Sequence, residues 1–154
     1  MMAFAVLLHV VSVVIWVGGM FFAYLVLRPV AARQLEPPVR LTLWAGVFDR
    51  FFPWVWSAVI AILATGFWMI FAVFGGMGGV GPHVHAMLGL GIAMMLIFFH
   101  VFFAPYRRLK QAVGAQDWPA GGRQLAQIRR LVGINTVLGL ATVAVASGGR
   151  YFVA

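Results

Sequence analysis

The chain has 154 residues, of which 64% are hydrophobic and only 9% charged, and its formal net charge is +8. Soluble domains carry about 25% charged residues, so this composition excludes a soluble globular protein and indicates one all-α membrane domain over residues 1–154. The basic residues lie between apolar runs, which favours membrane topology over nucleic-acid binding, and the absence of cysteine excludes disulfides, iron–sulfur clusters and thiolate-ligated haem.

The first apolar run covers residues 1–27 and reaches Arg28 without a charge. It exceeds the roughly 20 residues that a helix needs to cross the hydrocarbon core. It lacks the basic start and the cleavage site of a signal peptide, so we expect it to persist in the mature protein. After Pro37, apolar residues at helical spacing predict a short interfacial helix that leads into the next span at Pro53.

Three further apolar runs cover about residues 51–74, 83–106 and 129–150. With the first run, they predict an integral membrane four-helix bundle within the lipid bilayer. Ten of the eleven Lys and Arg residues lie in the two loops 28–50 and 107–130. The positive-inside rule therefore predicts a bacterial inner-membrane protein with both termini and the glycine-rich loop in the periplasm.

Few residues in the predicted spans can carry chemistry. The three acidic residues lie in or beside the basic loops, and no lysine lies within an apolar run. This distribution argues against a proton- or cation-coupled transporter, which usually needs an ionisable group at mid-depth. No pattern of paired carboxylates or of a Ser-His-Asp triad is found, so the sequence leaves open whether the protein is an enzyme.

All four histidines lie within apolar runs or at their ends. His9 lies roughly 10 Å below the outer surface at a rise of about 1.5 Å per residue, and His83 and His85 begin the third run from that side. Two imidazoles on facing helices are a common way for a helix bundle to hold haem b. We therefore predict that His9 and His85 are the axial ligands of one haem b, with His83 as the alternative to His85.

The surroundings of these histidines suit a flat cofactor. Trp16 shares a helix face with His9, so it can pack against a porphyrin. We expect room for the ring beside small residues, namely Gly19, Gly89, Asn135, Gly139 and Thr142. His100 lies roughly 22 Å deeper than His85, with no second histidine at its depth, so we expect it to serve in packing or hydrogen bonding.

A copper site is the competing interpretation of the outer segment. Met77, His83, His85 and Met87 lie close together in the sequence. Thioether sulfur selects copper(I), and imidazole accepts either oxidation state of copper. The alternative prediction is therefore a copper-binding or copper-transport membrane protein, with His83 and His85 as metal ligands.

Four segments of the chain resemble known membrane families. They are LHVVSVVIWVGGMFF in the first run, PHVHAMLGLGIAMML in the third, APYRRLK after it, and RRLVGINTVLGLATVAVA in the fourth. In combination they resemble the CopD-like family, whose name comes from copper resistance. They also resemble the HemJ type of protoporphyrinogen oxidase, which has a similar four-helix core with histidines.

The two resemblances imply different functions. HemJ-type proteins bind haem b through a histidine that corresponds to His9, and they carry His-x-Lys at the start of the third helix. This sequence has His83-Val84-His85 there and no lysine before Lys110, which argues against protoporphyrinogen oxidation. CopD-like proteins are described as copper-uptake proteins.

We therefore hypothesise a haem b membrane protein that transfers electrons near the periplasmic face to a redox partner or a quinone. The alternatives are a copper-binding or copper-transport protein and a HemJ-like protoporphyrinogen oxidase. The size of the chain is compatible with a homodimer.

Overall fold

The structure is a computed structural model that describes residues 1–152, and these residues form helices without any strand. Four helical columns are long and apolar enough to cross a membrane: Met2–Gln34, Pro37–Val73, Pro82–Gly114 and Trp118–Gly149. The predicted all-α membrane bundle of four helices is confirmed. Each column is longer than the apolar run that predicted it, because helical backbone continues into the basic loops.

Each column is built from one or more helical elements. The first contains α1 (Met2–Phe21), the π-helical stretch η1 (Phe22–Leu27) and α2 (Arg28–Gln34), and the second contains α3 (Pro37–Trp68) and the π-helical stretch η2 (Met69–Val73). A 3₁₀ turn, η3 (Met77–Gly79), lies in the link to the third column, which contains α4 (Pro82–Phe103) and α5 (Pro105–Gly114). The fourth column is α6 (Trp118–Phe152).

The structure differs from the sequence prediction between residues 37 and 53. A separate interfacial helix was expected there, but α3 is continuous from Pro37 through Pro53. The buried residues Leu41, Phe48 and Val55 recur at helical spacing on both sides of that proline, so one packed face extends along the helix. Pro53 itself is exposed, where its ring meets no core packing.

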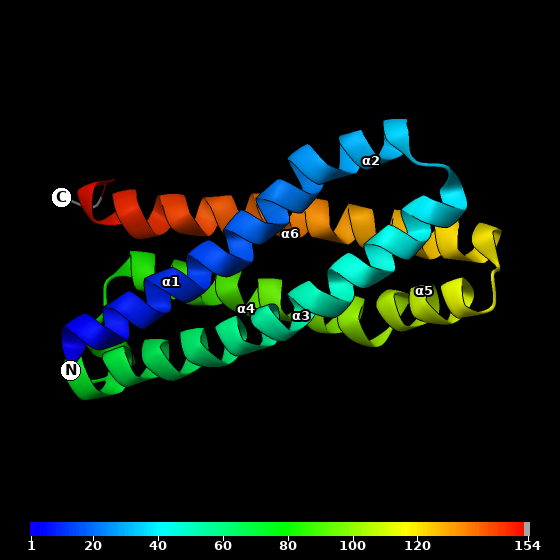
Figure 1. The fold of residues 1–154 in the computed structure, drawn as a ribbon. Helices are drawn as coiled ribbons and strands as arrows, with labels where there is room; N and C mark the ends of the chain where they lie inside the picture. The colour runs from blue at the N-terminus through cyan, green and yellow to red at the C-terminus, as the bar shows by residue number, and fades with distance from the viewer. Residues whose placement is uncertain (153–154) are drawn as a thin grey trace.

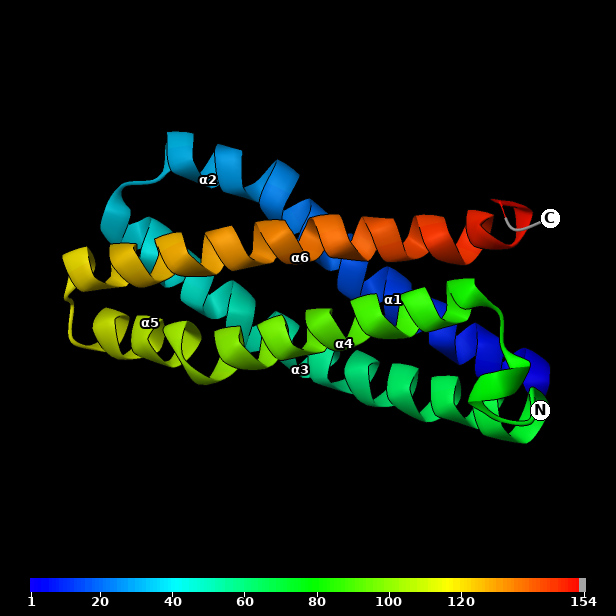
Figure 2. The ribbon, with the colours of Figure 1, turned by 180° about the vertical axis from the view of Figure 1, so that it is seen from behind.

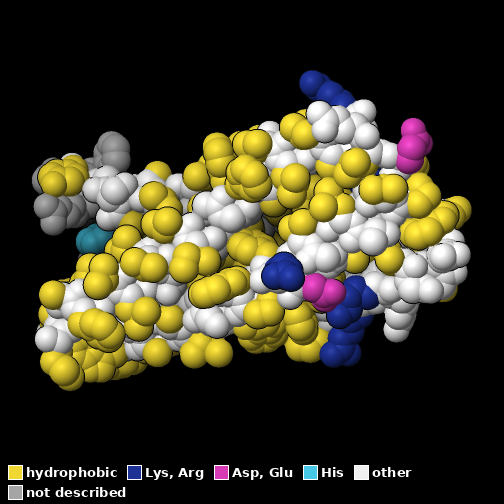
Figure 3. All heavy atoms as spheres, viewed as in Figure 1, with side chains coloured by type: hydrophobic (Ala, Val, Ile, Leu, Met, Phe, Trp, Pro, Cys, Tyr) yellow, Lys and Arg dark blue, Asp and Glu magenta, His cyan; other side chains and the backbone are white. Residues whose placement is uncertain are grey.

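The two ends of the bundle differ in character (Figures 1 and 2). The N-terminus, the end of α6 and the loop before α4 lie at one end, here called the glycine-loop end. The connections from α2 to α3 and from α5 to α6 lie at the other, here called the basic end. Hydrophobic side chains cover most of the face in Figure 3, and the Lys and Arg side chains visible there lie toward the basic end.

An aromatic wedge fills the space between α3 and the column of α4 and α5. The Phe52 ring lies 5.5 Å from the Phe98 ring and 4.7 Å from the Tyr106 ring, both edge to face. Trp56 stacks on Phe99 with 5.1 Å between ring centroids. Such pairs each contribute about 0.5–1.5 kcal/mol beyond the burial of area. This wedge holds α3 away from α4, while α1 packs along α3 and α4 packs along α6.

Two polar contacts to Asp49 link α3 to α5 at the basic end. The Tyr106 hydroxyl, on a buried residue, donates a hydrogen bond to Asp49 Oδ1. Lys110 Nζ lies 3.1 Å from the same oxygen and forms an exposed ion pair with it. An exposed pair contributes only about 0–1 kcal/mol, so the buried tyrosine makes the larger contribution to this link.

Gly139 allows three helices to meet in the middle of the bundle. A Cβ atom at this position would lie 2.9 Å from Val17 Cγ2 on α1 and 3.2 Å from Met94 Cε on α4. We expect Gly139→Leu to lower the free energy of unfolding by about 1–3 kcal/mol, because the inserted side chain overpacks the core. Unfolding in mixed detergent micelles measures this change. Gly18→Leu is the control, since a Cβ atom there meets nothing within 4 Å; equal effects of the two variants would contradict the packing argument.

Sidedness is a second prediction from the fold. Because the basic end carries both basic loops, we expect it to face the cytoplasm. Alkaline phosphatase fused after Ala154 is expected to be active, and the same enzyme inserted after Gln116 is expected to be inactive. A stable but inactive fusion after Ala154 would reverse the orientation.

Candidate functional site

His9 lies on α1 and faces α3. Its Nδ1 atom is 2.8 Å from Thr65 Oγ1, and the Thr65 hydroxyl lies 2.6 Å from the Ala61 carbonyl oxygen. The carbonyl can only accept, so the hydroxyl donates to it and must itself accept from the Nδ1–H of His9. This chain of hydrogen bonds places a proton on Nδ1 of His9, so in the neutral imidazole the Nε2 lone pair is available to a ligand.

Gly66 provides the space for this imidazole. A Cβ atom on Gly66 would lie 3.4 Å from His9 Cε1, so the ring rests against the backbone of α3. The half-buried His9 is therefore fixed both by a hydrogen bond and by packing. The contacts of this residue lie on α3, whereas the haem prediction pairs it with a residue of α4.

His83 and His85 point to different sides of α4. His83 is half-buried against α6, where a Cβ atom on Gly149 would lie 2.7 Å from His83 Cβ. His85 follows two residues later, about 200° around the helix, and is exposed. Among residues 1–152, no group of three or more His, Cys, Asp or Glu side chains is arranged to hold a metal ion.

The other residues expected beside a flat cofactor divide between the interior of the bundle and its surface. Trp16 is buried and meets the edge of Phe98, with 6.2 Å between the ring centroids. The space beside Gly19 holds the Phe51 ring, which would lie 2.4 Å from a Cβ atom on that glycine. Gly89 lies on the exposed surface of α4. Trp16 and Gly19 nevertheless line one common cavity, whereas Gly89 lies outside it.

His100 lies at the basic end of α4, away from the other histidines. It is exposed, and its Nε2 atom is 3.5 Å from Gln127 Nε2 on α6. This contact agrees with the hydrogen-bonding role expected from its isolated position in the sequence.

Met94 is a donor that the sequence analysis did not single out. Its side chain is buried between α4 and α6, where Thr142 Oγ1 lies 3.8 Å from its sulfur. Asn135 Nδ2 donates a hydrogen bond to the Met94 carbonyl oxygen at 3.2 Å. The available signal was the spacing of Met94 from His83, which is eleven residues and puts both on one helix face.

A central cavity of about 290 Å³ lies among α1, α3, α4 and α6. Its wall is almost entirely apolar and includes Met20, Phe48 and Phe98. Asn135 also lines it, and the buried Asn135 Oδ1 has no hydrogen-bond partner among the described residues. A buried amide oxygen without a partner is uncommon in folded proteins, so Asn135 is a polar exception in an otherwise apolar wall.

Comparison with known proteins identifies the family. The CopD family model, described as copper resistance protein D, matches residues 45–148, which is more than half of the chain. Searches of curated proteins and of solved structures found no match. The matched range contains His83, His85 and Met94 but not His9. The resemblance to HemJ-type proteins gains no support from this match. The chain belongs to the CopD family of membrane proteins, named for copper resistance.

Proposed function

We propose that this CopD-family protein binds copper(I) from the glycine-loop side of the membrane and holds it along the interface of α4 and α6. Membership of a copper-resistance family supports copper over haem b. The observation that carries the proposal is a stripe of neutral donors on α4, formed by His83, Met87 and Met94 and here called the donor stripe.

The spacing of the donor stripe follows the helix repeat. Residues separated by four and seven positions lie within an arc of roughly 40°, and the three donors span roughly 16 Å along the axis. Both ends of the stripe contact α6. His83 packs on Gly149, and the Met94 side chain packs beside Gly139 and Thr142.

The chemistry of these donors fits copper(I). Thioether sulfur is a soft ligand and imidazole binds copper in either oxidation state, so the set favours copper over magnesium or calcium. The donors are uncharged, and a monovalent ion needs less compensation in hydrocarbon than a divalent one. Thr142 packs beside the thioether, with its Oγ1 atom 3.8 Å from the Met94 sulfur. In this proposal copper is the cargo of the protein and not a resident cofactor.

The three histidines predicted as metal ligands have distinct roles in this proposal. His85 is exposed beside the start of α4, so it suits capture of copper at the membrane surface. His83 faces α6 and begins the donor stripe. His9, with its available Nε2, is a further donor at the glycine-loop end.

Haem b, with His9 and His85 as ligands, is the alternative function from the sequence. The contacts of His9 with α3 and the exposure of His85 do not favour it. Absorption spectra distinguish the two. Copper binding by a protein without a Soret band supports our proposal, whereas stoichiometric haem that is lost in His9→Ala would replace it.

Loss of an outer-shell partner weakens metal binding roughly 10- to 100-fold. We expect His83→Ala and Met94→Leu to weaken copper(I) binding by at least as much. The measurement is competition with a chromophoric copper(I) chelator, using full-length protein in detergent under reducing conditions.

Two matched variants control for loss of a side chain of the same type. His100→Ala removes an exposed histidine at the opposite end, and Met69→Leu removes a methionine of η2. Both are expected to bind copper like the unmodified protein. Equal affinity in all four variants would contradict the donor stripe.

A further inference from the structure

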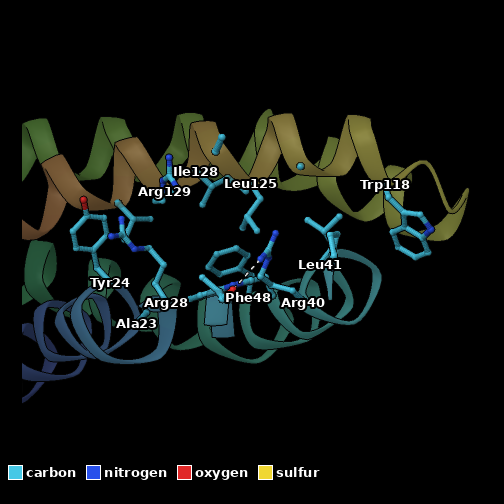
Figure 4. A pocket seen from close by; sticks show the side chains of 16 residues that line it. Ala23, Tyr24, Arg28, Arg40, Leu41, Phe48, Trp118, Leu125, Ile128 and Arg129 are labelled. Carbon is cyan, nitrogen blue, oxygen red and sulfur yellow. Dashed lines mark hydrogen bonds between the residues drawn. The ribbon is translucent and has the colours of Figure 1, made fainter. Parts of the chain in front are cut away.

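A second cavity, of about 250 Å³, lies at the basic end and is lined by three arginines. Arg28 begins α2, Arg40 lies in the first turn of α3, and Arg129 lies on α6. Figure 4 shows Arg28 and Arg40 extending from their helices toward the facing α6. Tyr24 and Trp118 also line this space, here called the arginine cavity.

Among the described residues, the guanidinium groups in this cavity have no carboxylate partners. The one ion pair in that part of the chain joins Lys110 to Asp49 at a different place. Arg40 Nη1 donates to the Ala32 carbonyl oxygen at 3.4 Å, which is a long hydrogen bond. Each guanidinium carries five N–H donors, so most of the donors around this cavity are free for a ligand. Three positive charges around one space favour an anion, and they repel a copper ion that would continue inward from the donor stripe.

Packing fixes one of the three arginines. The carbon at the centre of the Arg28 guanidinium lies 4.5 Å from the centre of the Tyr24 ring, in a cation–π contact. The Tyr24 ring in turn rests on α6, where a Cβ atom on Gly133 would lie 2.8 Å from Tyr24 Cε2. Arg28 is therefore held beside α6 before any ligand arrives. The planar fork of such a group matches the oxygens of a phosphate.

The arginine cavity adjoins the central cavity. Ala23, Phe48 and Val132 line both, so a positively charged space lies directly beside an apolar one. A ligand that fits both spaces has an anionic head and an apolar tail. In a bilayer, such molecules are abundant at the depth of the basic end, and basic pockets between membrane helices bind anionic lipid headgroups.

We propose that the arginine cavity binds the phosphate headgroup of an anionic phospholipid, with one acyl chain extending along the central cavity. The lipid bridges α2, α3 and α6 at the basic end. This inference does not depend on copper binding, because none of the three residues of the donor stripe lines either cavity.

The test uses full-length protein in a neutral detergent. Short-chain phosphatidylglycerol and phosphatidylcholine of equal acyl length are titrated separately, and bound lipid is counted by native mass spectrometry. We expect selective retention of one phosphatidylglycerol per chain. Trp44 and Trp118 line the cavity, so their fluorescence is expected to report the same titration. Equal retention of the two lipids would overturn the proposal without any variant.

Variants locate the site. Arg28→Gln, Arg40→Gln and Arg129→Gln are each expected to weaken phosphatidylglycerol binding about fivefold, which is the effect of one basic residue at an anionic lipid surface. Arg130→Gln is the matched control, because it removes a neighbouring exposed arginine that does not line the cavity. An equal loss in Arg129→Gln and Arg130→Gln would show a diffuse surface effect and overturn the proposal.

Glycerol phosphate is the probe that separates lipid from soluble phosphate. We expect it to compete only at concentrations far above those of the lipid, because it lacks the apolar tail. Equal competition would assign the cavity to a soluble phosphate compound and overturn the lipid assignment. Copper affinity is measured in the same variants. Unchanged copper binding shows that the protein is folded, and it keeps a failure of the lipid proposal distinct from a failure of the copper proposal.

Discussion

Close approach of helices to α6 is the constraint on which the rest of the structure depends. In hydrocarbon, helices gain little from burying apolar surface and associate through tight packing. Glycines, which have no side chain, therefore determine where two backbones can meet. Three glycines of α6 leave space for side chains of other helices, namely Gly133, Gly139 and Gly149. A Cβ atom at any of them would clash with such a side chain at 2.7–2.9 Å. Gly133 faces the Tyr24 ring, which supports Arg28. Gly139 faces the side chains of Val17 and Met94, and Gly149 faces His83. Both proposed sites therefore rest on the same helix, and a shift of α6 would disturb both.

The two ends of the bundle offer opposite chemistry. At the glycine-loop end the donors are neutral imidazole and thioether groups, which can accept a soft cation without adding charge to the membrane. At the basic end the free groups are guanidiniums, which favour anions and repel cations. Under the copper proposal, an ion that leaves the donor stripe meets a rising electrostatic barrier toward the arginine cavity. In the two proposals, this asymmetry separates a half that binds a cation from a half that binds an anionic lipid.

The sequence predicted the features that follow from long-range pattern. Four apolar runs predicted four helices, and loop charge predicted that both basic loops lie at one end, as they do. The direction of individual side chains was harder to predict. His83 and His85 are neighbours in sequence but face opposite sides of α4, and only the position of α6 shows which one is inside. Arg28, Arg40 and Arg129 were interpreted only as topology signals, because they are distant in sequence and converge through packing. Pro53 was a misleading boundary, because its exposed position lets α3 continue.

The π-helical stretch η1 sets the phase between the two halves of the first column. A π-helix has more residues per turn than an α-helix, so Phe22–Leu27 changes the direction in which every later residue points relative to α1. The stretch lies between Trp16, which faces the aromatic core, and Arg28, which faces the arginine cavity. α-Helical winding over the same six residues would turn Arg28 by roughly 100° relative to α1 while leaving His9 in place. The winding of these six residues therefore aligns Arg28 with the basic cavity, while the opposite end of the column keeps its direction.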